Sequence, residues 1–214
     1  MKNCIAFLTL SLFCCVPASA EDYPRAEVYG GYQLLDDEDL IHDLTYAQGL
    51  DIDGYDQLHG FNAAVEYNIR KWMGVVGEVG HGRSSLSLGD DNAGRPIWSA
   101  QYHRNQTSFL FGPRFSYRAG RIRAFGQLLL GGNRSNHSYT YTVTNELGFQ
   151  AGSAASFSNT DFALALGGGL DVSLGNRISI RPVQLDLLTI CADDTMYQLR
   201  YSAGIVFKLG SAKH

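Results

Sequence analysis

The feature that most constrains the fold is an alternation of apolar and polar side chains with a period of two residues. In residues 60–82, Phe61 and Val65 fall on one face of a predicted strand, and Asn62 and Glu66 fall on the other. This period predicts a β-strand with one apolar and one polar face. A soluble sheet would turn the apolar face inward to a core, whereas a membrane barrel would turn it outward to lipid.

The same alternation predicts eight strands in all. They cover residues 26–34, the two arms of the hairpin 60–82, and residues 108–117, 122–132, 162–172, 178–188 and 197–209. The seventh strand changes phase at Pro182, which predicts a β-bulge there. The stretch Ser138–Thr144 is also strongly β-forming. It would either extend the fifth strand above the membrane or begin another hairpin, so a ten-stranded barrel remains the alternative.

The predicted connections alternate strictly between short and long. The short links are residues 70–71, 118–121 and 174–177, and the long ones are residues 35–59, 83–106, 133–161 and 189–196. Transmembrane β-barrels have short periplasmic turns and long outer loops, and a soluble barrel has no physical reason for this asymmetry. The pattern therefore predicts an all-β fold, an antiparallel up-and-down transmembrane β-barrel with both termini in the periplasm.

The polar face of the predicted strands carries nine charges. They are Glu27, Glu66, Glu78, Arg114, Arg123, Asp171, Arg181, Asp186 and Arg200. Burying so many charges in a soluble core would be very costly, whereas a polar lumen accommodates them. The five acids and four arginines nearly cancel, which favours an ion-paired plug in a narrow barrel. A charge-lined pore is the alternative interpretation.

The first twenty residues predict a secretory signal peptide. Lys2 precedes an apolar run from Ile5 to Val16, and residues 18–20 form a small-x-small cleavage pattern. Cleavage would leave residues 21–214 as one barrel domain. A lipoprotein with Cys15 as its lipidated residue is disfavoured, because no small residue of the usual kind precedes it. The formal net charge of −4 argues against nucleic-acid binding.

Neither a metal site nor a catalytic site is predicted. Residues 51–62 have the wrong register for an EF-hand calcium loop. His81 with Ser84 or Ser85 and Glu78 could be drawn as a hydrolytic triad, but this pattern is weak, and no cofactor is expected. No pair of histidines has zinc-site spacing. His81 is expected at a strand end and His214 in the tail, and four others in loops: His42, His59, His103 and His137.

With its strands placed, the chain resembles the small outer-membrane β-barrel family, including the OmpA-type membrane domain and generic porin-family proteins. The stretches that carry the resemblance are "LFGPRFSY", "ALGGGLDV", "ISIRPVQLD" and "LRYSAGIVFKLG". The last strand is similar to the insertion signal of such proteins, at Ser202, Gly204, Phe207 and Leu209. The chain departs from the pattern by continuing with "GSAKH" after the last strand instead of ending on an aromatic residue. We expect no periplasmic peptidoglycan-binding domain after the barrel, so the cell-wall tethering of full-length OmpA-type proteins is not expected here.

The resemblance implies an integral outer-membrane protein, a monomer in contact with outer-membrane lipid and lipopolysaccharide, and inserted by the barrel-assembly machinery. We expect a structural or surface-interaction role. The alternatives are a narrow porin for small solutes, an outer-membrane lipid-modifying enzyme and a secreted soluble binding barrel.

Overall fold

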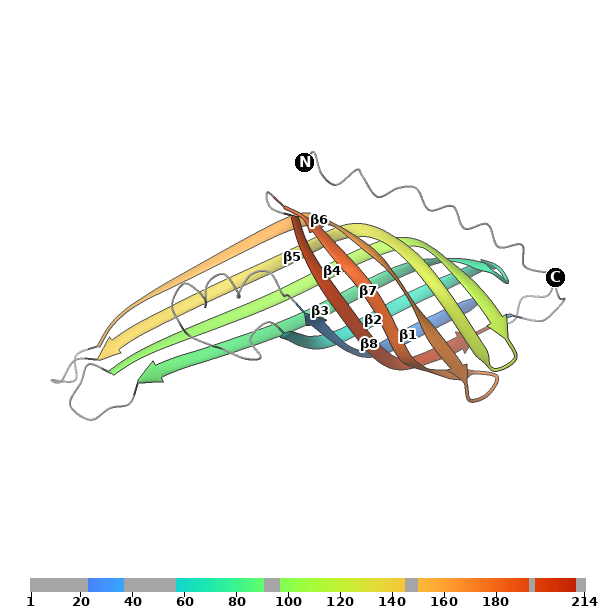
Figure 1. Ribbon diagram of the computed structural model, residues 1–214, viewed down its shortest axis with the longest axis horizontal. Helices are drawn as coiled ribbons and strands as arrows, with labels where there is room; N and C mark the ends of the chain where they lie inside the picture. Colours follow the sequence, from blue (N-terminus) through green and yellow to red (C-terminus); the bar gives the residue numbers. More distant parts are fainter. Residues whose placement is uncertain (1–22, 37–56, 91–96, 145–149, 193–194, 211–214) are drawn as a thin grey trace.

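The computed structural model describes residues 23–36, 57–90, 97–144, 150–192 and 195–210, which form eight antiparallel strands closed into a barrel (Figure 1). The strands are β1 (Ala26–Asp36), β2 (Gln57–Arg70), β3 (Met73–Asp90), β4 (Ile97–Ala119), β5 (Ile122–Thr144), β6 (Gln150–Ser173), β7 (Ile178–Cys191) and β8 (Thr195–Leu209). Within these ranges no helix is long and apolar enough to cross a membrane. The predicted signal peptide lies outside the described residues.

Every strand pairs with its neighbours in chain order, and β1 closes the ring against β8. The phase change at Pro182 is confirmed as an irregularity, because the β7–β8 register shifts between Arg181 and Gln184. A matching shift between Leu170 and Val172 occurs where β6 pairs with β7. The predicted eight-stranded, up-and-down barrel is confirmed.

The three predicted short connections are tight turns at the same end of the barrel (Figure 1). In the turn between β4 and β5, Gly120 has a φ of 59°. Side chains other than glycine rarely adopt this left-handed conformation, so glycine suits the position. This end also holds the start of β1 and the end of β8, and by the asymmetry of membrane barrels it is the periplasmic end.

The outer face of the ring is apolar and exposed. Phe109 is 57% exposed and Phe207 is 49% exposed, whereas Arg200 on the inner face is 0% exposed. On β4 the outward apolar positions run from Phe109 to Tyr117, and on β6 from Phe162 to Val172. These spans match the nine to eleven residues that a tilted strand needs to cross a bilayer. The barrel is therefore inverted relative to a soluble one, as predicted.

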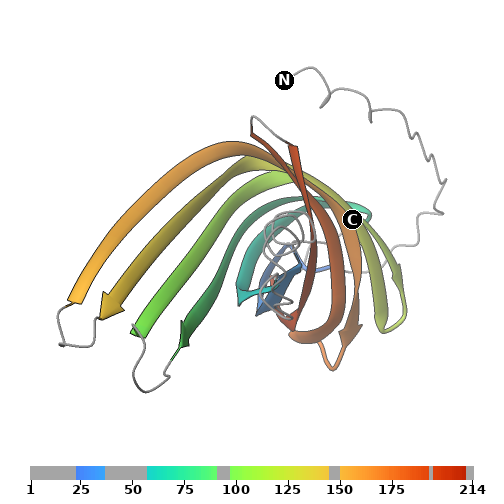
Figure 2. The ribbon, with the colours of Figure 1, turned by 60° about the vertical axis from the view of Figure 1, so that its left-hand side comes forward.

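Two of the predicted long loops are largely strand, which corrects the expectation for residues 83–106 and 133–161. Strands β3, β4, β5 and β6 continue far beyond the ring as a four-stranded sheet, here called the extension (Figures 1 and 2). The stretch Ser138–Thr144 belongs to β5, so the described residues contain eight strands and not ten. The alternation signal is weak here because the side chains on both faces of the extension are largely accessible to solvent.

The extension begins where β3 stops pairing with β2 and β6 stops pairing with β7. The last β2–β3 pair toward this end is His59 with Arg83, and the first β6–β7 pair is Phe162 with Cys191. Beyond these pairs, β3 and β6 are the two edges of the sheet in the described part of the chain. Figure 2 shows the four strands curving away from the ring side by side.

Candidate functional site

All nine charged residues predicted on the polar face lie inside the ring and are buried. Each of the eight strands contributes at least one of them, and β7 contributes two. They meet because inward-facing positions on neighbouring strands lie side by side in the pairing register. For example, Glu27 of β1 is opposite Glu66 of β2, and Arg123 of β5 is opposite Asp171 of β6.

Arg123 is the centre of the group nearest the periplasmic end. Its guanidinium forms ion pairs with Glu27 and Glu66, and it lies 3.5 Å from the carboxylate of Asp171. Arg114 donates to the second oxygen of Glu66 at 3.0 Å. The two glutamates on adjacent strands would repel each other alone, so the arginines across the lumen are what allow them to be buried together.

A second group lies further from the periplasmic end. Arg200 forms ion pairs with Glu78 and, at 2.8 Å, with Asp186. Asp186 also accepts hydrogen bonds from Gln127 at 2.8 Å and from Gln184 at 2.7 Å. The carboxylate of Asp186 therefore has three partners from three strands, which ties β5, β7 and β8 together across the interior.

Aromatic rings between these groups support the guanidinium groups. Arg181 donates to Asp171 at 2.7 Å and its guanidinium carbon lies 4.3 Å from the ring centroid of Tyr29 and 4.4 Å from that of Phe125. Arg114 lies 4.3 Å from the same Phe125 ring. Such cation–π contacts stabilise desolvated arginines. Neither ring was among the predicted site residues, although alternation places Tyr29 on the same face as Glu27 and Phe125 on the same face as Arg123.

An apolar layer closes the lumen further toward the outer end. Leu58, Leu129 and Leu188 are at most 1% exposed and belong to one buried cluster that also includes Leu35 and Leu110. These leucines were also missed, because a leucine on the inner face breaks the polar pattern used to assign that face. Together the ionic groups and the leucines fill the interior, as the small radius of an eight-stranded barrel allows.

The residues of the predicted insertion signal lie on both faces of β8. Phe207 and Leu209 point outward and are 49% and 52% exposed, whereas Ser202 is fully buried inside. Gly204 is opposite Gly31 of β1, and a Cβ at Gly204 would overlap the backbone of residues 30 and 31. Glycine at this position therefore permits β1 and β8 to meet where the barrel closes.

The weak triad pattern around His81, from which no catalytic site was predicted, does not bring His81 and Glu78 together. His81 faces outward, where its ring packs 5.7 Å from that of Phe61 and its Nδ1 lies 2.9 Å from Thr107 Oγ1. Glu78 points the other way and pairs with Arg200 in the lumen. Because His81 and Glu78 differ by an odd number of residues along a strand, they fall on opposite faces.

The predicted placement of the histidines, His81 included, was partly wrong. His81 lies within β3 and not at its end, because β3 continues to Asp90. His59, His103 and His137 belong to strands β2, β4 and β5 and not to loops, because those strands are longer than predicted. His42 and His214 lie outside the described residues.

The polarity of the sheet reverses in the extension. Positions that continue the inner face of the ring carry exposed aromatic side chains: Tyr139 is 46% exposed, Tyr141 47% and Phe157 61%. The ring centroids of Tyr102 and Tyr139 are 4.5 Å apart, and those of Tyr139 and Phe157 are 6.5 Å apart. This row of rings across β4, β5 and β6 is here called the aromatic face.

The opposite face of the extension, which continues the lipid-facing side of the ring, is polar. On β4 and β5 its residues are Ser99, Gln101, His103, Asn105, Asn136, Ser138, Thr140 and Thr142. A lipid-facing surface cannot be built from such residues. The extension therefore lies outside the bilayer.

Comparisons with known proteins identify a matching family model and several similar solved structures. Residues 6–184 match the model of the outer membrane protein beta-barrel domain family. No curated protein matches the chain. Among solved structures, the chain is similar to Ail, the attachment invasion locus protein of Yersinia pestis, in complex with the heparin analogue sucrose octasulfate. The two sequences are 17% identical, the match covers 86% of this chain and 97% of that chain, and the TM-score is 0.49.

Two further structures are similar at lower identity. The outer membrane protein OprG from Pseudomonas aeruginosa is 12% identical over 89% of this chain and 96% of its own, with a TM-score of 0.46. Neisserial surface protein A is 10% identical over 86% of this chain and 96% of its own, with a TM-score of 0.45. Since the family model spans most of the sequence and the ring has an apolar outer belt, the chain belongs to the outer membrane protein beta-barrel domain family and is a protein of the bacterial outer membrane.

Proposed function

We propose that the protein is a non-enzymatic surface-binding barrel that presents its extension to macromolecules outside the cell. The observation that carries this proposal is the reversal of polarity in the extension. Aromatic side chains that are exposed to water, gathered on one face and flanked by polar residues, are typical of a binding surface. A sheet that served only to stabilise the barrel would have no use for them.

The edges of the extension support the same function. From residue 151 to residue 160, β6 has no charged residue and no proline, and no described strand pairs with its outer side. Proteins usually protect long edges with charges, prolines or short strands. An unprotected edge is suited to accept an extended polypeptide as an added strand, whose side chains would then contact the aromatic face.

The closed lumen argues against the porin alternative. Ion pairs and leucines from every strand of the ring fill the interior, and the binding surface lies on the extension instead. We also propose that lipopolysaccharide contacts the polar face of the extension, and that residues 202–209 carry the signal for the assembly machinery. A single ring with its own closed interior needs no second subunit, so we propose a monomer.

Binding to extended polypeptides tests the proposal. The protein in lipid nanodiscs is titrated with a panel of unstructured peptides by biolayer interferometry. Tyr139→Ser with Phe157→Ser removes two exposed rings of the aromatic face, one on β5 and one on β6, and is expected to abolish binding. The matched control, Ser138→Ala with Thr140→Ala, changes neighbouring residues on the polar face and is expected to leave binding unchanged. Equal binding by both double variants would contradict the proposal.

A further inference from the structure

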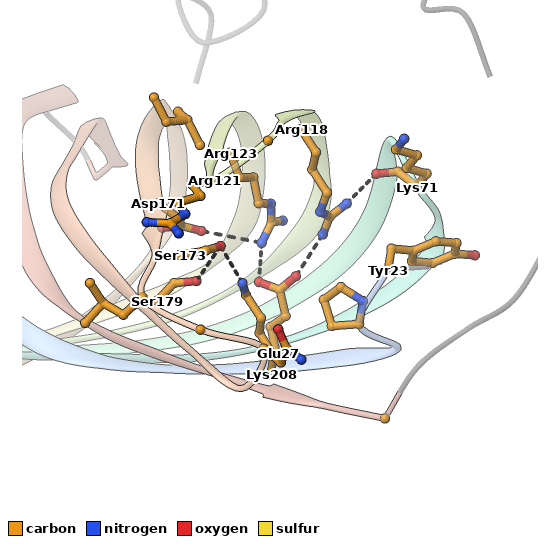
Figure 3. Close-up of a pocket in the computed structure, with 17 residues that line it drawn as sticks. Tyr23, Glu27, Lys71, Arg118, Arg121, Arg123, Asp171, Ser173, Ser179 and Lys208 are labelled. Atoms are coloured by element: carbon orange, nitrogen blue, oxygen red, sulfur yellow. Dashed lines mark hydrogen bonds and ion pairs between the residues drawn. The ribbon is translucent and has the colours of Figure 1, made fainter. Parts of the chain in front are cut away.

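The periplasmic end of the barrel contains a cavity of about 640 Å³, here called the vestibule (Figure 3). Its walls come from the turns at Lys71, Gly120 and Gly175 and from the end of β8. Glu27, Arg123 and Asp171, from the ionic group nearest the periplasmic end, also line it. The vestibule is therefore blind, because the ion pairs that close the barrel lie at its inner end.

The lining of the vestibule is cationic. It contains five basic residues and two acidic ones: Lys71, Arg118, Arg121, Arg123 and Lys208, against Glu27 and Asp171. The acids already have arginine partners, since Glu27 pairs with Arg118 at 2.8 Å and with Arg123, and Asp171 pairs with Arg181 at 2.7 Å. The excess positive charge is thus not neutralised from within the lining.

Two of the cations are in no ion pair among the described residues. Lys208 Nζ donates to the hydroxyl of Ser173 at 2.6 Å, and neither Lys208 nor the exposed Arg121 forms an ion pair there. Ser173 Oγ lies 3.3 Å from Ser179 Oγ, and Ser179 is fully buried. Figure 3 shows the Lys208 ammonium and the two hydroxyls converging on one side of the vestibule.

We propose that the vestibule binds a phosphate group, with Lys208, Arg121 and the hydroxyl groups of Ser173 and Ser179 as the recognising donors. An ammonium, a guanidinium and two hydroxyls can share the several oxygens of a tetrahedral anion, and charge-assisted hydrogen bonds of this kind are strong. The volume exceeds that of one phosphate and leaves room for a further group on the ligand. The site is distinct from the aromatic face and does not depend on the surface-binding function.

The phosphate has two possible sources, a phospholipid headgroup or a soluble phosphate compound of the periplasm. A lipid is within reach, because Ile122 and Leu174 line the vestibule and are 52% and 66% exposed. A soluble compound would enter from the open periplasmic end. The chemistry of recognition is the same for both.

Binding of inorganic pyrophosphate to the full chain in zwitterionic detergent is measured by isothermal titration calorimetry. We expect saturable binding that weakens about tenfold in Lys208→Gln, the loss of one charge-assisted hydrogen bond. Arg121→Gln, in an exposed turn where the fold is not at risk, is expected to weaken it as well. Arg25→Gln is the control, because Arg25 is an exposed cation near the same end that donates to Tyr67 and does not line the vestibule.

Native mass spectrometry of the protein extracted from phosphatidylglycerol vesicles distinguishes the two sources. Retention of one phosphatidylglycerol by the wild type and by Arg25→Gln, with loss in Lys208→Gln, identifies a lipid headgroup. Saturable pyrophosphate binding without lipid retention identifies a soluble phosphate. The proposal is overturned if neither ligand is bound, or if Arg25→Gln weakens binding as much as Lys208→Gln and Arg121→Gln do, since the attraction would then be a diffuse effect of net charge.

Discussion

Replacing Arg200 with methionine tests whether the lumen is a dry, ion-paired plug. Arg200, Glu78 and Asp186 have no exposed side-chain surface, and the arginine pairs with both carboxylates. In Arg200→Met, Asp186 keeps its hydrogen bonds from Gln127 and Gln184, whereas Glu78 keeps only a long contact of 3.4 Å from Gln184. Removing one partner of a buried ion pair costs about 3–5 kcal/mol, because a charge is left uncompensated.

The free energy of unfolding is measured by urea titration of the protein in lipid vesicles. A loss of about 3–5 kcal/mol would change the unfolding equilibrium constant by a hundredfold or more. Adding Glu78→Gln to Arg200→Met removes the uncompensated charge and is expected to restore part of the loss. Arg177→Met, at an exposed arginine of the β6–β7 turn that does not line the vestibule, is the control and is expected to change stability by less than about 0.5 kcal/mol.

A loss below about 1 kcal/mol in Arg200→Met would refute the reasoning, because it is the size expected for solvated ion pairs. Water would then reach Glu78 and Asp186, and the interior would be an aqueous passage instead of a plug. No recovery on adding Glu78→Gln would refute the assignment of the penalty to that carboxylate.

Three further outcomes are expected. Gly204→Val is expected to prevent closure of the barrel, which would be seen as loss of the fast-migrating band of unboiled protein on a denaturing gel. The control Gly30→Ala, where a Cβ meets nothing within 4 Å, is expected to keep the band. Equal behaviour of the two variants would mean that the contact between β1 and β8 tolerates side chains. The wild-type protein in planar bilayers is expected to give no porin-sized conductance steps, because side chains fill its interior; regular steps would restore the porin interpretation. Amides of residues 134–144 are expected to exchange hydrogen faster than those of residues 122–132 of the same strand, because within the described residues no further strand pairs with the outer edges of the extension. Equal protection in mass-spectrometric exchange would show that the extension is covered.

The membrane-spanning part of the fold was predictable because the alternation that defines it is local. Outward apolar residues such as Phe109 and Phe115 reveal the lipid-facing side without knowledge of any partner strand. The extension was not predictable in this way. Its strands contain Ser, Thr, Asn and Gly on the polar face, and they are held by ladder hydrogen bonds to neighbours instead of by burial of an apolar face.

The inner face was predictable as a set of residues but not as an arrangement. Parity alone placed Glu66 and Arg114 on one face of their strands, and the near balance of charge suggested pairing. Parity could not show that Arg123 donates a hydrogen bond to Glu27, 96 residues away. Nor could it show that the guanidinium of Arg181 contacts the rings of both Tyr29 and Phe125. The vestibule was likewise invisible, because Lys208 and Ser173 come from strands that are not sequence neighbours.

By itself the sequence determined the sidedness, the positions of eight membrane-crossing strands and the alternation of short and long links, because each depends on residues within one strand or one link. Whether residues 138–144 add a further hairpin was left open, and the structure decided it by placing them in β5. The tertiary structure decided which charges meet, where the leucines close the lumen, how far four strands continue outside the membrane and where the cations of the vestibule converge. These features depend on the register in which the strands pair around a closed ring. A register is fixed by contacts across the whole barrel, and no single stretch of the chain contains it.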